Sequence, residues 1–222
     1  MARRDRAGFE ITPDLLLKAY ACGIFPMAET ADDPHVHWID PRERGVIFLD
    51  EFHIPRSLKK VIRRDTFDVR VDTAFPAVLD ACGEPTPERP QTWINATIRQ
   101  LYLELFRLGH AHSVESWRDG QLVGGLYGVS LGGVFFGESM FSRETDASKV
   151  ALVHLWDRLR RGGYVLLDTQ FITGHLARFG AREIPRADYQ RLLEDGVTRT
   201  ATFHPAGGGT SDSALQPFSH TS

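Results

Sequence analysis

The segment VFFGESMFS at residues 134–142 places one carboxylate among aromatic and sulfur-bearing side chains. Its alternation is that of a β-strand, so Phe136, Glu138 and Met140 are expected on one face. A carboxylate buried on such a face is costly unless it is hydrogen-bonded or paired with a positive charge. An amine substrate would supply that charge, as would an arginine such as Arg143, and an exposed edge strand would remove the cost. Glu138 is therefore a candidate for amine chemistry, with a structural role left open.

A second polar pair closes the apolar run YVLLDTQF at residues 164–171. Asp168 and Gln170 follow what we predict to be a buried strand, and alternation places both side chains on the same side. In open α/β sheets, ligands bind beyond the carboxyl ends of the strands. A carboxylate beside an amide can orient a proton acceptor and stabilise a developing positive charge. The alternative is that Asp168 only caps the following turn.

A basic run is the best candidate contact for phosphates. It consists of five residues within nine positions, Arg56, Lys59, Lys60, Arg63 and Arg64. Spacings of three and four place most of them on one helix face, with Leu58 and Ile62 elsewhere. In a chain of net charge −3 such a face is polarised, which suits a nucleic acid backbone, although many charged faces are only solvated.

Other chemical motifs are weak or absent in the sequence. His35 and His37 form one H-x-H pair and His110 and His112 another, but no further ligand set with metal spacing accompanies them, so no metal site is expected. The sequence contains no P-loop, no G-x-G-x-x-G and no G-x-S-x-G.

The elements that must position these residues follow from periodicity and capping signals. An antiparallel meander is predicted over residues 111–142, with turns at Asp119-Gly120 and Gly132-Gly133. Asp72 and Asp146 are expected to cap helices, and residues 24–45 are predicted as a loop. Helices are predicted over 11–23, 54–65, 73–83, 94–110, 146–163, 173–180 and 186–196, and further strands over 46–50, 67–71, 164–171 and 181–185.

Composition bounds the class of protein. With 222 residues, 42% hydrophobic and 25% charged, the composition is that of an ordinary globular protein, and the order of the predicted elements indicates an α/β fold of the α+β type. Two cysteines without a C-x-x-C pair fit a reducing compartment, and no apolar run reaches the roughly 18 residues of a membrane span. The N-terminal residues lack the apolar region of a signal peptide. A cytoplasmic protein without a membrane partner is expected.

Several segments together resemble one family. These segments are LLLKAYACGIFPM, FHIPRSLKK, GHAHSVESW, LVGGLYGVSLGGVFFGESMFSRETDASKVAL, LLDTQF and GAREIPRADY, which fall within residues 11–195. They are similar to the bacterial leucyl/phenylalanyl-tRNA–protein transferases. The combination of GESMFS, ASK and D-x-Q is the specific part of this resemblance.

The resemblance implies a fold and an activity. It implies a small N-terminal domain at residues 1–50 and an N-acetyltransferase-like (GNAT-type) domain with a mixed, largely antiparallel sheet at 51–203, with 204–222 as a disordered tail. The implied activity moves leucine or phenylalanine, with methionine as a further candidate, from aminoacyl-tRNA to an N-terminal Arg or Lys of an acceptor protein. That addition marks the acceptor for degradation through the N-degron pathway. No cofactor is implied, because the aminoacyl ester is already activated, and the chain is expected to be a monomer.

Residue roles carry over position by position. Asp168 and Gln170 match the catalytic pair of the family, and Glu138 matches the carboxylate of its polar network. Trp38, Trp93 and Tyr102 match aromatic positions around the tRNA 3′ adenosine and the site entrance, with Ile39 in place of a second tryptophan. The positions that correspond to the amino-acid pocket are Leu126, Phe135, Leu155, Leu159 and Leu167.

Three other functions stay open on the sequence alone. A related aminoacyl-tRNA-dependent transferase would act on a different acceptor, and a non-catalytic protein of the same fold would bind aminoacyl-tRNA without forming a peptide bond. A small-molecule acetyltransferase is disfavoured, because the sequence lacks the Q/R-x-x-G-x-G/A phosphate-binding loop of acetyl-CoA enzymes.

Overall fold

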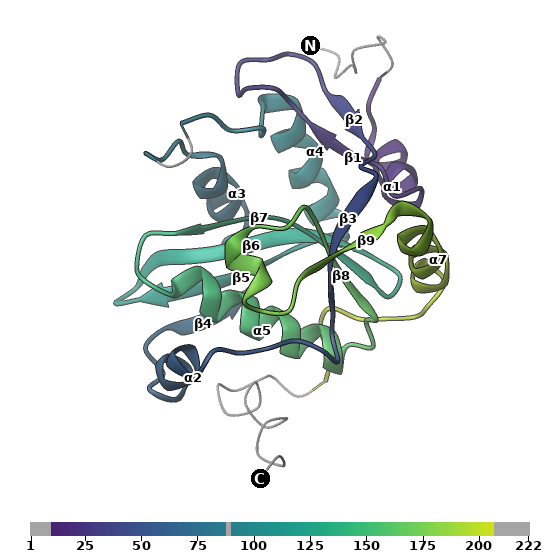
Figure 1. Ribbon diagram of the computed structural model, residues 1–222. Coiled ribbons are helices and arrows are strands. Elements are labelled where there is room, and N and C mark those ends of the chain that lie inside the picture. Colours follow the sequence, from purple (N-terminus) through teal and green to yellow (C-terminus); the bar gives the residue numbers. More distant parts are fainter. Residues whose placement is uncertain (1–9, 88–89, 207–222) are drawn as a thin grey trace.

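A computed structural model describes residues 10–87 and 90–206, and a seven-stranded sheet forms its centre (Figure 1). The strand order is β4-β5-β6-β7-β8-β3-β9. Neighbouring strands are antiparallel, except that β7 and β8 are parallel, so the protein has a mixed α/β fold with a mixed sheet. The strands are β3 Glu43–Phe48, β4 Asp68–Val71, β5 Ala111–Arg118, β6 Gln121–Leu131, β7 Val134–Ser142, β8 Leu166–Gln170 and β9 Arg182–Pro185.

The predicted meander is confirmed as β5-β6-β7. The parallel pair β7–β8 results from the helix that connects these two strands. Asp119 and Gly120 both have positive φ, as the tight β5–β6 turn requires. Parallel strands cannot be joined by a hairpin. Helix α5, Ala147–Arg161, makes the crossover from β7 to β8.

Helices cover both faces of the sheet and create two core layers. The first layer contains α1 Pro13–Ala21, α3 Phe75–Gly83, α4 Ala96–Arg107 and α7 Arg186–Val197. The second contains α2 Arg56–Arg63 and α5, with the short α6 Gly174–Ala177 beside them. We call these the α1/α4 side and the α5 side. None of the described helices is long and apolar enough to cross a membrane.

The N-terminal region contains more structure than the sequence predicted. Helix α1 begins and ends as expected: Thr12 Oγ1 accepts from Leu15 N, and Gly23 follows with φ +80°. The predicted loop at 24–45 instead contains a hairpin of β1 Phe25–Met27 and β2 His37–Ile39. Strand β3 also falls inside the expected 1–50 domain, yet it pairs with β8 and β9 in the large sheet.

Two capping predictions need correction. Asp72 does not cap α3, because its Oδ1 accepts from Ser113 N while the Glu115 carboxylate takes Ala74 N. Asp146 stands at the N-cap of α5, but it has φ +68° and its side chain binds Lys149. A short polar residue before a helix signals a cap only when no tertiary partner competes for its side chain.

Two β-bulges change the direction of side chains near the carboxyl end of the parallel pair. Between β6 and β7, Tyr127 pairs with Ser139 and Gly128 with Gly137, so Glu138 is the extra residue. A Cβ on Gly128 would lie 2.2 Å from the Phe136 carbonyl oxygen, so this approach requires glycine.

The second bulge lies between β8 and β3. Gly45 pairs with Gln170 and Val46 with Asp168, which leaves Thr169 as the extra residue. The expectation that Phe136 and Met140 share a face is wrong, because Phe136 packs on the α1/α4 side and Met140 on the α5 side. A bulge shifts the alternation by one residue.

The expected tail at 204–222 lies mostly outside the described residues, which end at 206. Phe203, just before this segment, is fixed by packing and by a hydrogen bond. Phe203 is buried, its ring stacks on those of His112 and Phe135, and Arg158 Nη1 donates to its carbonyl oxygen.

Candidate active site

An apolar pocket of about 280 Å³ opens where the parallel strands β7 and β8 separate. Their pairing ends at Phe136 opposite Asp168, and Glu138 and Gln170 lie two residues further along each strand. Both side chains line the pocket, while aliphatic side chains form most of its remaining wall. Ligands are expected in this position, beyond the carboxyl ends of parallel strands.

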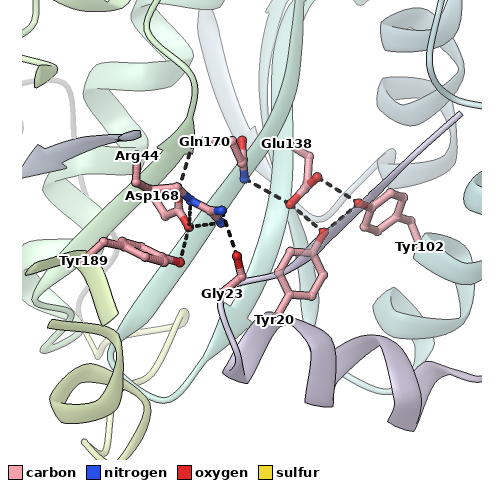
Figure 2. A network of polar contacts seen from close by, with 8 residues as sticks. All are labelled: Tyr20, Gly23, Arg44, Tyr102, Glu138, Asp168, Gln170 and Tyr189. Atoms are coloured by element: carbon pink, nitrogen blue, oxygen red, sulfur yellow. Dashed lines mark hydrogen bonds and ion pairs between the residues drawn. The ribbon is translucent and has the colours of Figure 1, made fainter. Parts of the chain in front are cut away.

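Glu138 is held by two tyrosines from the α1/α4 side (Figure 2). Tyr20 Oη donates to its Oε1 at 2.7 Å and Tyr102 Oη to its Oε2 at 2.8 Å, and the two hydroxyls lie 2.7 Å apart. Burial raises the pKa of Glu138 to about 7, against the lowering effect of the tyrosine hydrogen bonds. Arg143, the alternative partner, pairs with Glu84 instead.

Gln170 reaches the pocket because its backbone is unusual. It has φ +57°, a value that non-glycine residues seldom adopt, and its N–H donates to Asp168 Oδ1 at 2.9 Å. Its side-chain Nε2 lies 3.4 Å from Glu138 Oε1. With the amide in this assigned orientation, the Gln170 carbonyl oxygen is the end not used by Glu138.

Asp168 does not line the pocket, and the expectation that it shares one side with Gln170 as a pocket residue is wrong. Its side chain is fully buried on the α1/α4 side. Arg44 Nε and Nη2 donate to the carboxylate at 2.7–3.1 Å, and Tyr189 Oη donates at 2.6 Å. The carboxylate therefore contacts the pocket through the Gln170 backbone, and its charge also raises the pKa of Glu138.

Sequence reasoning does not single out Arg44. Its guanidinium binds Asp168, donates to the Gly23 carbonyl oxygen at 2.8 Å and lies between the rings of Phe25 and Tyr189, 4.6 and 4.5 Å from their centroids. Burial acts to lower the pKa of Arg44, but the charge and hydrogen bonds of Asp168, together with smaller effects of Tyr189 and Glu138, outweigh it and the net shift is upward. One side chain thus connects the N-terminal segment, β8 and α7.

Three of the five residues predicted for an amino-acid pocket lie around the apolar cavity. Leu126, Leu155 and Leu167 line it, and so do Met140, Leu152 and Leu176, which were not predicted. Phe135 and Leu159 are fully buried core residues instead. Two polar atoms of lining residues, Thr169 Oγ1 and His175 Nε2, are buried without a hydrogen-bond partner among the described residues.

A smaller cavity of about 60 Å³ adjoins the same two polar residues. Phe25, Pro26, Met27, Trp93 and Phe171 line it together with Glu138 and Gln170. Trp93 therefore lies at the site as predicted, whereas Tyr102 is fully buried and contributes through Glu138. Trp38 is half-buried in β2 and lines neither cavity.

The basic run forms helix α2 as predicted. Leu58 and Ile62 are buried against the α5 side, while Arg56, Lys60, Arg63 and Arg64 are exposed and Lys59 is half-buried. The helix packs on α5 (Figure 1), and none of its residues lines either cavity.

Two family models match this chain. The N-terminal domain model of leucyl/phenylalanyl-tRNA protein transferase matches residues 9–42, and the model of the transferase itself matches residues 46–194. The chain belongs to the leucyl/phenylalanyl-tRNA protein transferase family. It is an aminoacyltransferase. The N-terminal model ends at residue 42, just before β3, and the second model begins at residue 46, inside β3.

Named relatives agree along nearly the whole chain. A leucyl/phenylalanyl-tRNA–protein transferase of Paramagnetospirillum magneticum is 61% identical over 87% of this chain and 92% of its own length. One from Rhodopseudomonas palustris is 57% identical over 91% of this chain and 88% of its own. A solved C-terminal domain named for a lysylphosphatidylglycerol synthetase of Agrobacterium fabrum is 15% identical, with a TM-score of 0.41 over 94% of this chain and 69% of that one, a likeness that carries no argument.

The buried ion pair predicts a strong energetic coupling. Arg44→Met should lower the free energy of unfolding by about 3–5 kcal/mol, because it leaves Asp168 buried without a counter-charge. Adding Asp168→Asn should recover part of that loss in a double-mutant cycle measured by urea denaturation. The exposed pair Arg118–Glu144 is the control, and Arg118→Met should cost less than about 1 kcal/mol. Additive losses at Arg44 and Asp168 would contradict the coupling.

The raised pKa of Glu138 predicts a pH dependence of stability. The folded-state pKa of Glu138, about 7, lies above the unfolded value of 4.5. Protonation of Glu138 therefore contributes fully to the free energy of unfolding below pH 4.5, and this contribution is lost as pH rises through 7. Between pH 8 and pH 5 the wild type should gain about 2–3 kcal/mol relative to Glu138→Gln. Urea denaturation of both proteins across this range measures the difference, and parallel pH profiles would show that Glu138 is ionised throughout.

Proposed function

We propose that this protein transfers leucine, phenylalanine or methionine from aminoacyl-tRNA to the N-terminal Arg or Lys of acceptor proteins, which creates a degradation signal of the N-degron pathway. The observation that carries the proposal is the apolar pocket of about 280 Å³ with Glu138 and Gln170 at its polar end. The pocket holds the donor side chain, and the ester carbonyl lies beside these two residues. The activity is cytoplasmic and the protein acts as a monomer.

The fold we propose is the N-acetyltransferase-like (GNAT-type) one. An antiparallel meander, a crossover helix and a parallel strand that separates from its neighbour at the site support it. The missing acetyl-CoA loop in the sequence fits a donor other than acetyl-CoA.

The chemical step needs little acid–base help. The acceptor α-amino group has an ordinary pKa of roughly 7.7–8.0, so a neutral fraction exists near pH 7. Its nitrogen attacks the ester carbonyl, the C–N bond forms, and the C–O bond to the tRNA ribose breaks. The released ribose oxygen takes a proton that the amine loses. No cofactor is required, since the ester is already activated.

Gln170 and Glu138 divide the work at the amine. The Gln170 carbonyl oxygen accepts a hydrogen bond from the attacking amine and aligns it. Glu138 holds the Gln170 amide, and with a pKa of about 7 it can accept the amine proton and pass it on. One well-placed polar group of this kind is commonly worth about 2.7–4 kcal/mol. Asp168 is a positioning residue, because it holds the Gln170 backbone.

The tRNA contacts lie on two surfaces. The smaller cavity receives the 3′ adenosine beside Trp93, with Trp38 and Tyr102 as neighbouring aromatic residues of the same region. Helix α2 binds the phosphate backbone through Arg56, Lys59, Lys60, Arg63 and Arg64.

A direct assay tests the function. The protein is incubated with Leu-tRNA, Phe-tRNA or Met-tRNA and peptides that begin with Arg, Lys, Asp or Ala, and the added residue is detected by mass spectrometry. We expect transfer to Arg and Lys peptides only. Transfer to the Asp peptide would show a different acceptor class, and binding of aminoacyl-tRNA without transfer would show a non-catalytic protein.

The pocket assignment predicts a change in donor preference. Leu155→Ala enlarges the pocket and should favour Phe-tRNA over Leu-tRNA by about 10-fold or more in relative kcat/KM. Leu159→Ala, one helical turn further along α5 in the core, is the matched control. It should lower stability by about 2–5 kcal/mol and leave the donor ratio unchanged. Equal donor ratios in both variants would remove the pocket from donor selection.

The basic helix predicts a salt effect. Lys59→Glu with Arg63→Glu should raise KM for aminoacyl-tRNA and flatten its dependence on salt between about 50 and 200 mM. Arg107→Glu reverses an exposed charge on α4 and should change neither quantity. A KM that the double variant leaves unaltered would mean that α2 is only solvated.

A further inference from the structure

Three potential metal ligands meet outside the two cavities of the active site. They are Asp72 after β4, His112 in β5 and His204 in the segment after α7. One donor atom from each lies within 4.8 Å of the other two. No other group of three His, Cys, Asp or Glu residues comes together in this way within residues 10–87 and 90–206.

We propose that Asp72, His112 and His204 bind a divalent transition-metal ion, with Zn²⁺ as the expected ion. Two imidazole nitrogens and one carboxylate oxygen are donors that Zn²⁺ binds well. His112 and Asp72 are largely buried, whereas the His204 side chain is 59% exposed, so solvent has access for a fourth ligand.

The spacing of the donor atoms is close to what a tetrahedral ion needs. His112 Nδ1 lies 2.7 Å and His204 Nε2 3.0 Å from the same Asp72 Oδ2. Donors bonded at about 2.0–2.1 Å to a tetrahedral ion lie roughly 3.3 Å from one another. Each imidazole nitrogen would therefore have to lie a few tenths of an ångström further from Asp72 Oδ2, and the two nitrogens, now within 4.8 Å of each other, would have to lie about 3.3 Å apart. The competing arrangement is a hydrogen-bonded cluster in which both imidazoles donate to one oxygen.

The surroundings hold two of the ligands in place. Asp72 Oδ1 accepts from Ser113 N at 2.7 Å, which leaves Oδ2 for the ion. The Phe203 ring stacks on His112 with 4.1 Å between centroids, and it precedes His204 in the chain. Outer contacts of this kind orient metal ligands. Arg158 lies over the Phe203 ring, and its positive charge would repel the metal ion. The negative charge of the Asp72 carboxylate would attract the ion.

The site would act on structure rather than on transfer. None of its three residues lines the apolar pocket or the smaller cavity. The ion would fasten the segment after α7 to β5 and to the end of β4, three parts of the chain that are distant in sequence. The inference is therefore independent of the proposed function.

The test uses the full chain without an affinity tag, stripped of metal by a chelator and titrated with ZnCl₂ by calorimetry. We expect one Zn²⁺ per chain and a weakening of at least about tenfold in His204→Ala. Zinc at about 100 times its Kd should raise Tm by about 5–10 °C in the wild type and not in the variant. Co²⁺ should give the visible absorption of a tetrahedral site.

The matched control is His35→Ala. His35 and His37 also face one carboxylate, that of Asp33, but they contact different oxygens at 3.2 Å each. This variant should bind Zn²⁺ as the wild type does. His204→Gln serves as a second variant if His204→Ala folds poorly. Wild-type protein without saturable binding at one equivalent, or binding of equal strength in both His204 variants, would overturn the proposal.

Discussion

The buried ion pair between Arg44 and Asp168 is the constraint on which the site depends. Taking both charges out of water costs several kcal/mol per ion, and only a complete set of partners offsets this. The pair has such a set. The Tyr189 hydroxyl and the Gln170 N–H donate hydrogen bonds to the Asp168 carboxylate, and the Arg44 guanidinium donates to the Gly23 carbonyl oxygen and contacts two aromatic rings. The geometry is satisfied only when α1, β3, β8 and α7 are all in place. The ion pair thus couples the position of the N-terminal segment to the backbone conformation of Gln170.

The sequence predicted elements well because they depend on local signals. Helix α1, the meander and α5 each follow from capping residues, turn residues and periodicity. Leu126, Leu155 and Leu167, which the resemblance assigns to an amino-acid pocket, line the cavity, and their role there stays a prediction. The hairpin of β1 and β2 was missed, since strands of three residues within a proline-rich loop leave no alternation to detect.

The site itself was harder to predict, because two bulges decide it. Alternation placed Asp168 and Gln170 on one side, but the extra residue Thr169 and the positive φ of Gln170 separate them. Arg44 was missed for a related reason: a lone arginine in a strand gives no local sign that it will meet a carboxylate 124 positions away. Such pairings depend on the tertiary fold, and a single sequence shows only which residue types are present, not which of them pair.

The surroundings of Glu138 suit both its protonated and its ionised form. In its protonated form it is a buried acid among tyrosines, and burial favours that form. In its ionised form two hydroxyls already point at it, so no reorganisation is needed when the proton moves. The Asp168 charge raises the pKa of Glu138 and the Arg44 charge lowers it, so the two charges of the ion pair have opposing effects on Glu138. A pKa near 7 is the result, and an arriving amine would complete the shift to the charged form.

On the proposed function this pocket would hold the donor side chain, and the composition of its wall then predicts no narrow choice of donor. An apolar slot discriminates by only about 1–3 kcal/mol per methylene. Met140 adds a flexible, unbranched side chain to the leucines, and such a wall can repack around linear, branched or aromatic groups. Small side chains such as that of alanine lose most of the burial energy and are rejected by that loss alone. Charged side chains would be disfavoured by desolvation, because aliphatic side chains form most of the wall. Selection among large apolar donors therefore rests on fit, and fit in a leucine-rich pocket is permissive.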